Sequence, residues 1–142
     1  MSYRAILVVD DDEKLRRMLT FFFVKKGFKV VSAKDGIDAI KILGRLRPDI
    51  ILLDLAMPDM DGFEFCTRIK KDALWAEIPL IVISALPAAY NRERVLSLGV
   101  SDYFEKPFVS SELMDRVTKL LNVEENVFGC NSGVLNYKGG GV

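Results

Sequence analysis

The sequence contains no histidine, and this absence removes several kinds of site at once. Without an imidazole, the chain cannot build a Ser-His-Asp triad, a histidine-ligated zinc site or a phosphohistidine of its own. Its two cysteines, Cys66 and Cys130, lack the spacing of metal ligands, and Cys66 is expected to be a small buried or half-buried group and not a reactive thiol. The chemistry of this chain must therefore rest on other side chains.

The chain also lacks a net charge and long apolar runs. Twenty basic and twenty acidic residues cancel, so we expect no nucleic-acid binding by this domain and no attraction to an anionic membrane. No apolar run approaches the roughly 20 residues that span a bilayer, and the start, Met-Ser-Tyr-Arg, lacks the apolar core of a signal peptide. These absences predict a cytoplasmic protein, and the 142 residues fit one domain with a sizeable core.

Five segments are predicted to be short strands, and several of them are apolar enough to be buried on both faces. They are Ala5–Val9, Lys29–Ala33, Ile50–Leu53, Leu80–Ile83 and Asp102–Glu105. The third consists of four large aliphatic residues followed at once by Asp54, so it delivers a carboxylate to its own end. A carboxylate is costly to bury without a partner. Taken alone, Asp54 could equally begin a solvated turn or cap the next helix.

An amphipathic segment follows each strand. The first is expected to begin at Asp12 as N-cap and to stop at Gly27, and the second to end at Pro48. The later helices are predicted over Phe63–Lys71, over Ala88–Leu98 and from about Ser110. The apolar faces of the first two are expected to consist of Leu15, Met18, Leu19 and Phe22, and of Ile37, Ile40, Leu43 and Leu46.

The alternation of strands and helices predicts a doubly wound α/β fold with three layers. Several strands are apolar on both faces, as strands of a parallel sheet covered by helices must be. In such sheets ligands bind outside the carboxyl ends of the strands. The polar residues at those ends come from four different strands and are expected to meet at one edge: Asp10, Asp11, Asp54, Ser84 and Lys106.

The chemistry of this set points to phosphoryl transfer. Three crowded carboxylates need a compensating cation, and hard oxygen ligands at a partly open site suit Mg2+. Asp10 and Asp11 are a pair and are assigned to the metal, whereas Asp54 stands alone as a nucleophile toward phosphorus. Lys106 is the only cation at a strand end and would neutralise the transferred group. The Ser84 hydroxyl could donate to a phosphoryl oxygen.

These residues resemble the receiver domain of two-component response regulators, over about residues 3 to 122. The motifs that carry the resemblance are Val8-Val9-Asp10-Asp11, Asp54 with Met57-Pro58-Asp59-Met60-Asp61-Gly62, Ile83-Ser84-Ala85 and Lys106-Pro107-Phe108. The resemblance implies a flavodoxin-like, five-stranded parallel sheet of strand order 2-1-3-4-5 with five helices. It also implies a phosphoryl donor, either a sensor histidine kinase or a phosphotransfer protein, and an output domain or protein partner.

The resemblance further implies roles for single residues. Mg2+ would be held by Asp10, Asp11, Asp54 and the backbone carbonyl of Ala56. The bond between Lys106 and Pro107 would be cis. Ser84 and Tyr103 would form the switch, with the Tyr103 ring moving inward as Ser84 approaches the phosphoryl group, so that the face of the fourth helix, fifth strand and fifth helix changes shape.

Other readings of the same residues remain open. A phosphatase or phosphotransferase of the haloacid dehalogenase type would use Asp10 as its nucleophile, and Asp10-Asp11-Asp12 contains the Asp-x-Asp that such enzymes need. A receiver-like module could also bind partners without being phosphorylated. Tyr103 could be a half-buried strand aromatic, and Asp59 and Asp61 are expected to be loop or capping residues.

The domain boundary is expected near residue 122. Residues 1–122 form the receiver unit, and 123–142, which have no sustained periodicity, are expected to be a flexible tail, a linker or a remnant of an expression vector. A phosphorylation-dependent homodimer is a further hypothesis. It rests on charged residues that partly fit the pattern of relatives that dimerise, namely Arg92, Asp102, Glu112 and Arg116.

Overall fold

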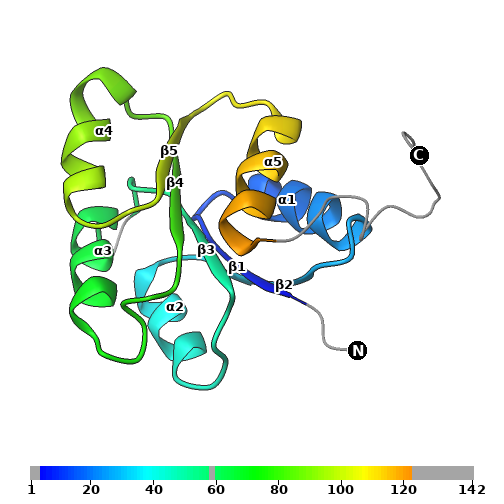
Figure 1. The fold of residues 1–142 in the computed structure, drawn as a ribbon, viewed down its shortest axis with the longest axis horizontal. Helices are drawn as coiled ribbons and strands as arrows, with labels where there is room; N and C mark the ends of the chain where they lie inside the picture. The colour runs from blue at the N-terminus through cyan, green and yellow to red at the C-terminus, as the bar shows by residue number, and fades with distance from the viewer. Residues whose placement is uncertain (1–3, 58–59, 123–142) are drawn as a thin grey trace.

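The computed structural model describes residues 4–57 and 60–122 and contains five strands and five helices in these ranges, in strict alternation (Figure 1). The strands are β1 (Ala5–Val9), β2 (Lys29–Ala33), β3 (Ile50–Leu53), β4 (Leu80–Ser84) and β5 (Asp102–Glu105). The helices are α1 (Glu13–Lys25), α2 (Gly36–Leu43), α3 (Gly62–Lys71), α4 (Ala88–Ser97) and α5 (Ser110–Leu121). The predicted strand positions and the alternating order are therefore confirmed.

All neighbouring strands are parallel, and their order is β2-β1-β3-β4-β5. Every residue of β1, β3 and β4 is buried, which explains why these three strands read as continuous apolar runs. The edge strand β2 is buried fully only at Ala33. The chain order reverses between β1 and β3, so that a site can form at the carboxyl ends of these two central strands.

Helices cover both faces of the sheet. In Figure 1, α1 and α5 lie on one side of the edge-on sheet, and α2, α3 and α4 lie on the other. Successive residues of a strand point to opposite faces. Ile6 and Val8 of β1 accordingly pack in the core under α1 and α5, whereas Leu7 and Val9 pack in the larger core under the other three helices.

The ends of α1 agree with the sequence, but its apolar face differs in part. Asp12 is the N-cap, and its side chain accepts from the backbone N–H groups of Lys14 and Leu15. Gly27, with φ 96°, follows the helix. Met18, which was predicted on the apolar face, is 46% exposed, whereas Phe23 is fully buried. The phenylalanine run offered apolar side chains on several faces, so spacing alone could not identify the inner one.

The predicted end of α2 was wrong, and its predicted apolar face was right only in part. The helix ends at Leu43 with Gly44 as C-cap, well before Pro48. Its buried residues are Gly36, Ala39 and Leu43, whereas Ile37 is 44% exposed. At Gly36 a side chain would collide with Met60, because an added Cβ would lie 3.0 Å from its sulfur and 3.1 Å from its Cβ. Of the four residues predicted on the apolar face, Leu43 is buried and Ile40 packs against the core, whereas Ile37 is exposed and Leu46 lies beyond the end of the helix.

Cys66 lies fully buried in α3, as expected, and burial raises the pKa of its thiol to about 12. The thiol therefore stays protonated at neutral pH, and only the thiolate reacts quickly with alkylating agents. We expect the folded protein at pH 8 to resist iodoacetamide at Cys66, and the urea-unfolded protein to react fully. Peptide mass spectrometry measures both. Equal alkylation of Cys66 in the two states would contradict the burial.

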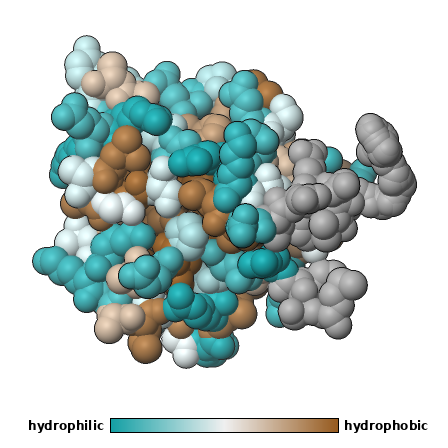
Figure 2. All heavy atoms as spheres, viewed as in Figure 1, coloured by the Kyte–Doolittle hydropathy of each residue, from teal (hydrophilic) through white to brown (hydrophobic). Residues whose placement is uncertain are grey.

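On the face drawn in Figure 2, hydrophilic and hydrophobic residues are interspersed. Among the residues that the structure describes, no helix is both long and apolar enough to cross a bilayer.

Candidate functional site

The predicted site residues stand at the carboxyl edge of the sheet. Asp10 directly follows β1, Asp54 follows β3, and Lys106 follows β5, while Ser84 is the last residue of β4. Backbone hydrogen bonds continue the ladders past the strand ends. The N–H of Asp10 donates to the carbonyl of Ala33 at 3.1 Å, that of Asp54 to Val9 at 2.9 Å, and that of Lys106 to Ser84 at 2.8 Å. The site residues are therefore held on the rigid sheet.

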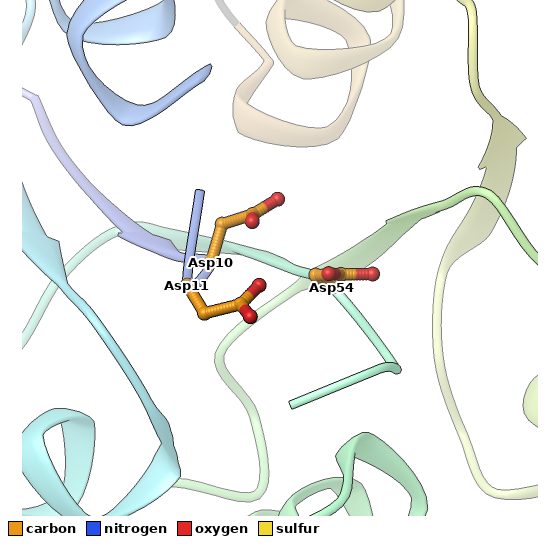
Figure 3. A group of neighbouring side chains, drawn as sticks. All are labelled: Asp10, Asp11 and Asp54. Carbon is orange, nitrogen blue, oxygen red and sulfur yellow. The ribbon is translucent and has the colours of Figure 1, made fainter. Parts of the chain in front are cut away.

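Three carboxylates meet at this edge. One carboxylate oxygen from each of Asp10, Asp11 and Asp54 lies within 4.8 Å of the others. Figure 3 shows the side chains of Asp10 and Asp11 extending toward the side on which Asp54 lies. Asp10 and Asp54 are buried, whereas Asp11 is exposed. The cluster therefore has a buried floor and one acid open to solvent.

Lys106 supplies the positive charge at this cluster. Its ammonium nitrogen lies 2.9 Å from Oδ2 of Asp10 and 3.8 Å from Oδ2 of Asp54. The Lys106 side chain is 22% exposed, so water screens these ion pairs only in part. The peptide bond between Lys106 and Pro107 is cis, as predicted. One lysine cannot neutralise three acids, and the site keeps an excess of negative charge.

Opposing influences act on the pKa of the Asp54 carboxyl group. Burial raises its pKa above the ordinary value, and the nearby Asp10 carboxylate raises it further. The ammonium of Lys106 and a hydrogen bond from the backbone N–H of Ala56, at 3.3 Å, lower it. Asp54 is therefore a poorly hydrated carboxylate, and its charge is opposed by the Asp10 carboxylate and favoured by the Lys106 ammonium.

The donor set fits a hard cation. Carboxylate oxygens are the preferred ligands of Mg2+, and the one exposed acid leaves the cluster accessible. Oδ1 of Asp10 already accepts from the N–H of Asp12 at 2.8 Å, and this bond fixes the orientation of the carboxylate. The three acids could therefore hold a metal ion.

Ser84 and Tyr103 lie beside the cluster and are linked through the loop after β4. Ser84 is fully buried, and its Oγ accepts from the N–H of Leu86 at 3.1 Å. Tyr103 is only 4% exposed, and its hydroxyl donates to the carbonyl of Leu86 at 2.6 Å. Burial also raises the pKa of the Tyr103 phenol. The side chain is therefore buried rather than half-buried, and the switch role of Tyr103 stays a prediction.

Arg16 supports the site, although the sequence gave no reason to select it. This residue of α1 donates from its guanidinium to the backbone carbonyl of Asp10 at 2.7 Å. The bond ties the turn that carries Asp10 and Asp11 to α1. A hydrogen bond from a side chain to a backbone carbonyl leaves no pattern in the sequence. Only the position of Arg16 near the start of α1, shortly after the two acids, could have suggested it.

The loop after Asp54 is described only in part. Asp61 is the N-cap of α3 and accepts from the N–H of Glu64 at 2.9 Å, in agreement with the expected capping role. Asp59, for which a loop or capping role was also expected, lies outside the described residues.

Residues 6–118 match the family of the response regulator receiver domain, which is most of the chain. The chain belongs to this family. The receiver domain is the phosphorylated part of two-component systems, and phosphorylation on an aspartate is general to it. Membership also displaces the dehalogenase-type alternative, in which Asp10 would be the nucleophile.

Curated relatives of this receiver domain include transcriptional regulators. It is 36% identical over 140 residues to the probable transcriptional regulator ycf27 of Porphyridium aerugineum, covering 96% of this chain and 57% of that protein. It is 34% identical over 122 residues to the DNA-binding dual master transcriptional regulator RpaA of Synechocystis, covering 86% of this chain and 51% of that protein. The chain thus spans about half the length of the curated relatives it matches.

Solved receiver domains share the fold. The receiver domain of a Francisella response regulator superposes with a TM-score of 0.78 at 32% identity, covering 84% of this chain and 97% of that one. A putative response regulator from Chloroflexus aurantiacus gives a TM-score of 0.81 at 28% identity, covering 85% of this chain and 99% of that one. The flavodoxin-like strand order and the assignment to a receiver domain are thereby confirmed.

Proposed function

We propose that this receiver domain accepts a phosphoryl group on Asp54 from a sensor histidine kinase or a phosphotransfer protein. The observation that carries the proposal is the position of Asp54. It is a buried carboxylate at the end of a central strand, within 4.8 Å of two further acids and 3.8 Å from an ammonium. Such a group can attack phosphorus when the charge of the transferred group is neutralised.

The residues of the site would divide the work of one displacement. A carboxylate oxygen of Asp54 attacks phosphorus, the bond from phosphorus to the donor breaks, and the donor leaves with the electron pair. The ammonium of Lys106 lies 3.8 Å from Oδ2 of Asp54 and would neutralise negative charge on the transferred group. Asp10, Asp11, Asp54 and the carbonyl of Ala56 would hold Mg2+, which supplies further positive charge to the transferred group.

We also propose that phosphorylation is read out through Ser84 and Tyr103. A Ser84 hydroxyl that donates to a phosphoryl oxygen must turn toward Asp54, and the bond from Leu86 to Ser84 Oγ links that movement to the following loop. The Tyr103 hydroxyl holds the same Leu86 by its carbonyl. The reshaped face of α4, β5 and α5 would then act on an output domain or a separate protein partner.

A labelling experiment tests this function. The full chain is incubated with acetyl phosphate and Mg2+, alone and with excess EDTA, beside the variants Asp54→Asn and Asp10→Asn. We expect an acid-stable, base-labile phosphoryl group that EDTA prevents. Asp54→Asn should lose the label wholly and Asp10→Asn only in part, because Asp10 binds metal but does not form the bond.

The other outcomes separate the alternatives. A label that survives Asp54→Asn but vanishes in Asp10→Asn would support an enzyme with Asp10 as nucleophile. A wild-type protein that takes no label from acetyl phosphate would support a module that binds partners without phosphorylation.

The domain division remains a proposal. We propose that residues 1–122 are the receiver unit and 123–142 a linker. The match to the Porphyridium relative supports a linker over a vector remnant, because it covers 96% of this chain and so includes part of 123–142. Under this proposal, any DNA binding of the kind named in the Synechocystis relative lies outside the receiver unit.

Phosphorylation-dependent dimerisation through α4, β5 and α5 also stays a proposal. Asp102 already pairs within the chain, with Arg92 at 3.1 Å and with Arg116 at 3.0 Å. A dimer that used Asp102 would need to share or exchange these partners.

A further inference from the structure

The helix α4 begins without a capping side chain of its own. Pro87 occupies the N-cap position, makes no side-chain hydrogen bond, and no acidic residue follows in the first turn. The first N–H groups of a helix have no partner within it and need an acceptor from elsewhere. Here β5 supplies one, because Oε1 of Glu105 accepts from the N–H of Ala88 at 2.8 Å.

Two side chains of β5 therefore hold the same loop. Residues two apart on a strand share a face, and Tyr103 and Glu105 are such a pair. Tyr103 bonds the carbonyl of Leu86 at 2.6 Å, and Glu105 bonds the N–H of Ala88 at 2.8 Å. In Figure 1, α4 lies beside β5, so these bonds link adjacent elements.

The effect of Glu105 on the site is separate from that of its neighbour Lys106. The Lys106 ammonium bonds Asp10 at 2.9 Å, whereas the Glu105 carboxylate is exposed and bonds the start of α4. Replacing Glu105 thus removes a helix cap and leaves the charges of the acidic cluster in place.

We propose that Glu105 is a positioning residue that stabilises the phosphorylated form by capping α4. This inference rests on the proposed function. The Glu105 bond is present in an arrangement in which the Tyr103 ring is buried, which is the ring position expected of the phosphorylated form. A bond that favours one of two arrangements also favours, by linkage, whatever binds to that arrangement. Losing the cap should therefore weaken the response to a phosphoryl group.

Beryllium fluoride with Mg2+ tests this, because it forms a tetrahedral adduct on carboxylates that imitates a phosphoryl group. The full chain is compared with Glu105→Ala, Glu105→Gln and the control Glu93→Ala, which removes an exposed acid from α4 itself. Titrations give the apparent Kd for beryllium fluoride and for Mg2+ alone. Hydrogen exchange at the Ala88 amide, measured in the protein saturated with beryllium fluoride and Mg2+, reports the cap in the arrangement that it is proposed to favour.

In Glu105→Ala we expect about fivefold faster exchange at Ala88 and an about fivefold higher Kd for beryllium fluoride, the usual size of a lost cap. Mg2+ affinity should stay within about twofold. Glu105→Gln keeps an acceptor oxygen without the charge and should fall between wild type and alanine, which keeps the test valid where Glu105→Ala folds poorly. Glu93→Ala should match the wild type.

An unchanged beryllium fluoride Kd in both Glu105 variants would overturn the inference, even with faster exchange at Ala88, because Glu105 would then be only a structural cap. A wild-type protein that takes up no beryllium fluoride with Mg2+ would overturn the proposed function and this inference together. Uptake by the wild type with unaltered Glu105 variants would reject the inference alone.

Discussion

Replacing Lys106 with methionine is expected to slow phosphoryl transfer from acetyl phosphate to Asp54 by about 100-fold or more. Methionine keeps the length and apolar stem of the side chain but removes the ammonium that lies 2.9 Å from Asp10 and 3.8 Å from Asp54. The acids would then repel an approaching phosphoryl donor without the ammonium that lies directly against their carboxylates. A 100-fold loss corresponds to about 2.7 kcal/mol of transition-state stabilisation.

Initial rates of labelling at saturating Mg2+ measure this effect, and Lys119→Met provides the control. Lys119 also forms an ion pair, with Asp115 at 3.1 Å, but its side chain is 66% exposed and lies on α5. Its loss should leave the labelling rate within about twofold, as expected for a surface pair. Labelling of Lys106→Met at the wild-type rate would show that the ammonium has no part in the transfer.

Replacing Gly62 with alanine is expected to lower the free energy of unfolding by about 3 kcal/mol. A Cβ on Gly62 would lie 2.4 Å from Cα of Leu55 and 3.0 Å from the carbonyl oxygen of Asp54. Cδ2 of Leu55 would also lie at 2.8 Å, and this side-chain end could turn aside, but the other two atoms belong to the backbone and cannot. The start of α3 must therefore move away from the residues that follow β3, and labelling of Asp54 should fall as well.

Urea denaturation of Gly62→Ala and Gly44→Ala makes the comparison. Gly44 follows α2 with helical backbone angles, and a Cβ there would meet the carbonyl oxygens of Lys41 at 3.4 Å and of Ile40 at 3.9 Å, which are ordinary contact distances. Alanine at this position should change the free energy of unfolding by less than about 1 kcal/mol, in the stabilising direction. Equal losses at the two glycines would mean that close backbone packing is not what selects glycine at Gly62.

The fold and the main site residues could be predicted because each left a local mark in the sequence. A buried central strand such as β3 must be apolar on both faces, and the acid that follows it must then stand at the sheet edge. The topology brings the carboxyl ends of four strands to one edge of the sheet, so Asp10, Asp54 and Lys106 could be grouped from the sequence alone. Their roles came from carboxylate and lysine chemistry and from the family resemblance.

Other features leave no such mark, because they depend on how elements pack. The buried face of α2 includes Gly36 and Ala39, small residues that a search for large apolar side chains at helical spacing does not select. The contacts of Arg16 with the Asp10 carbonyl and of Glu105 with the Ala88 N–H join side chains to backbone groups. No spacing rule encodes such contacts, so they become visible only in three dimensions.

Locating the phosphoryl group on the chain tests the central claim most directly. After reaction with acetyl phosphate and Mg2+, borohydride reduces an aspartyl phosphate to homoserine, and peptide mass spectrometry identifies the converted residue. The account predicts conversion at Asp54 and at no other acid of the cluster. Conversion at Asp10 or Asp11, with Asp54 intact, would contradict it.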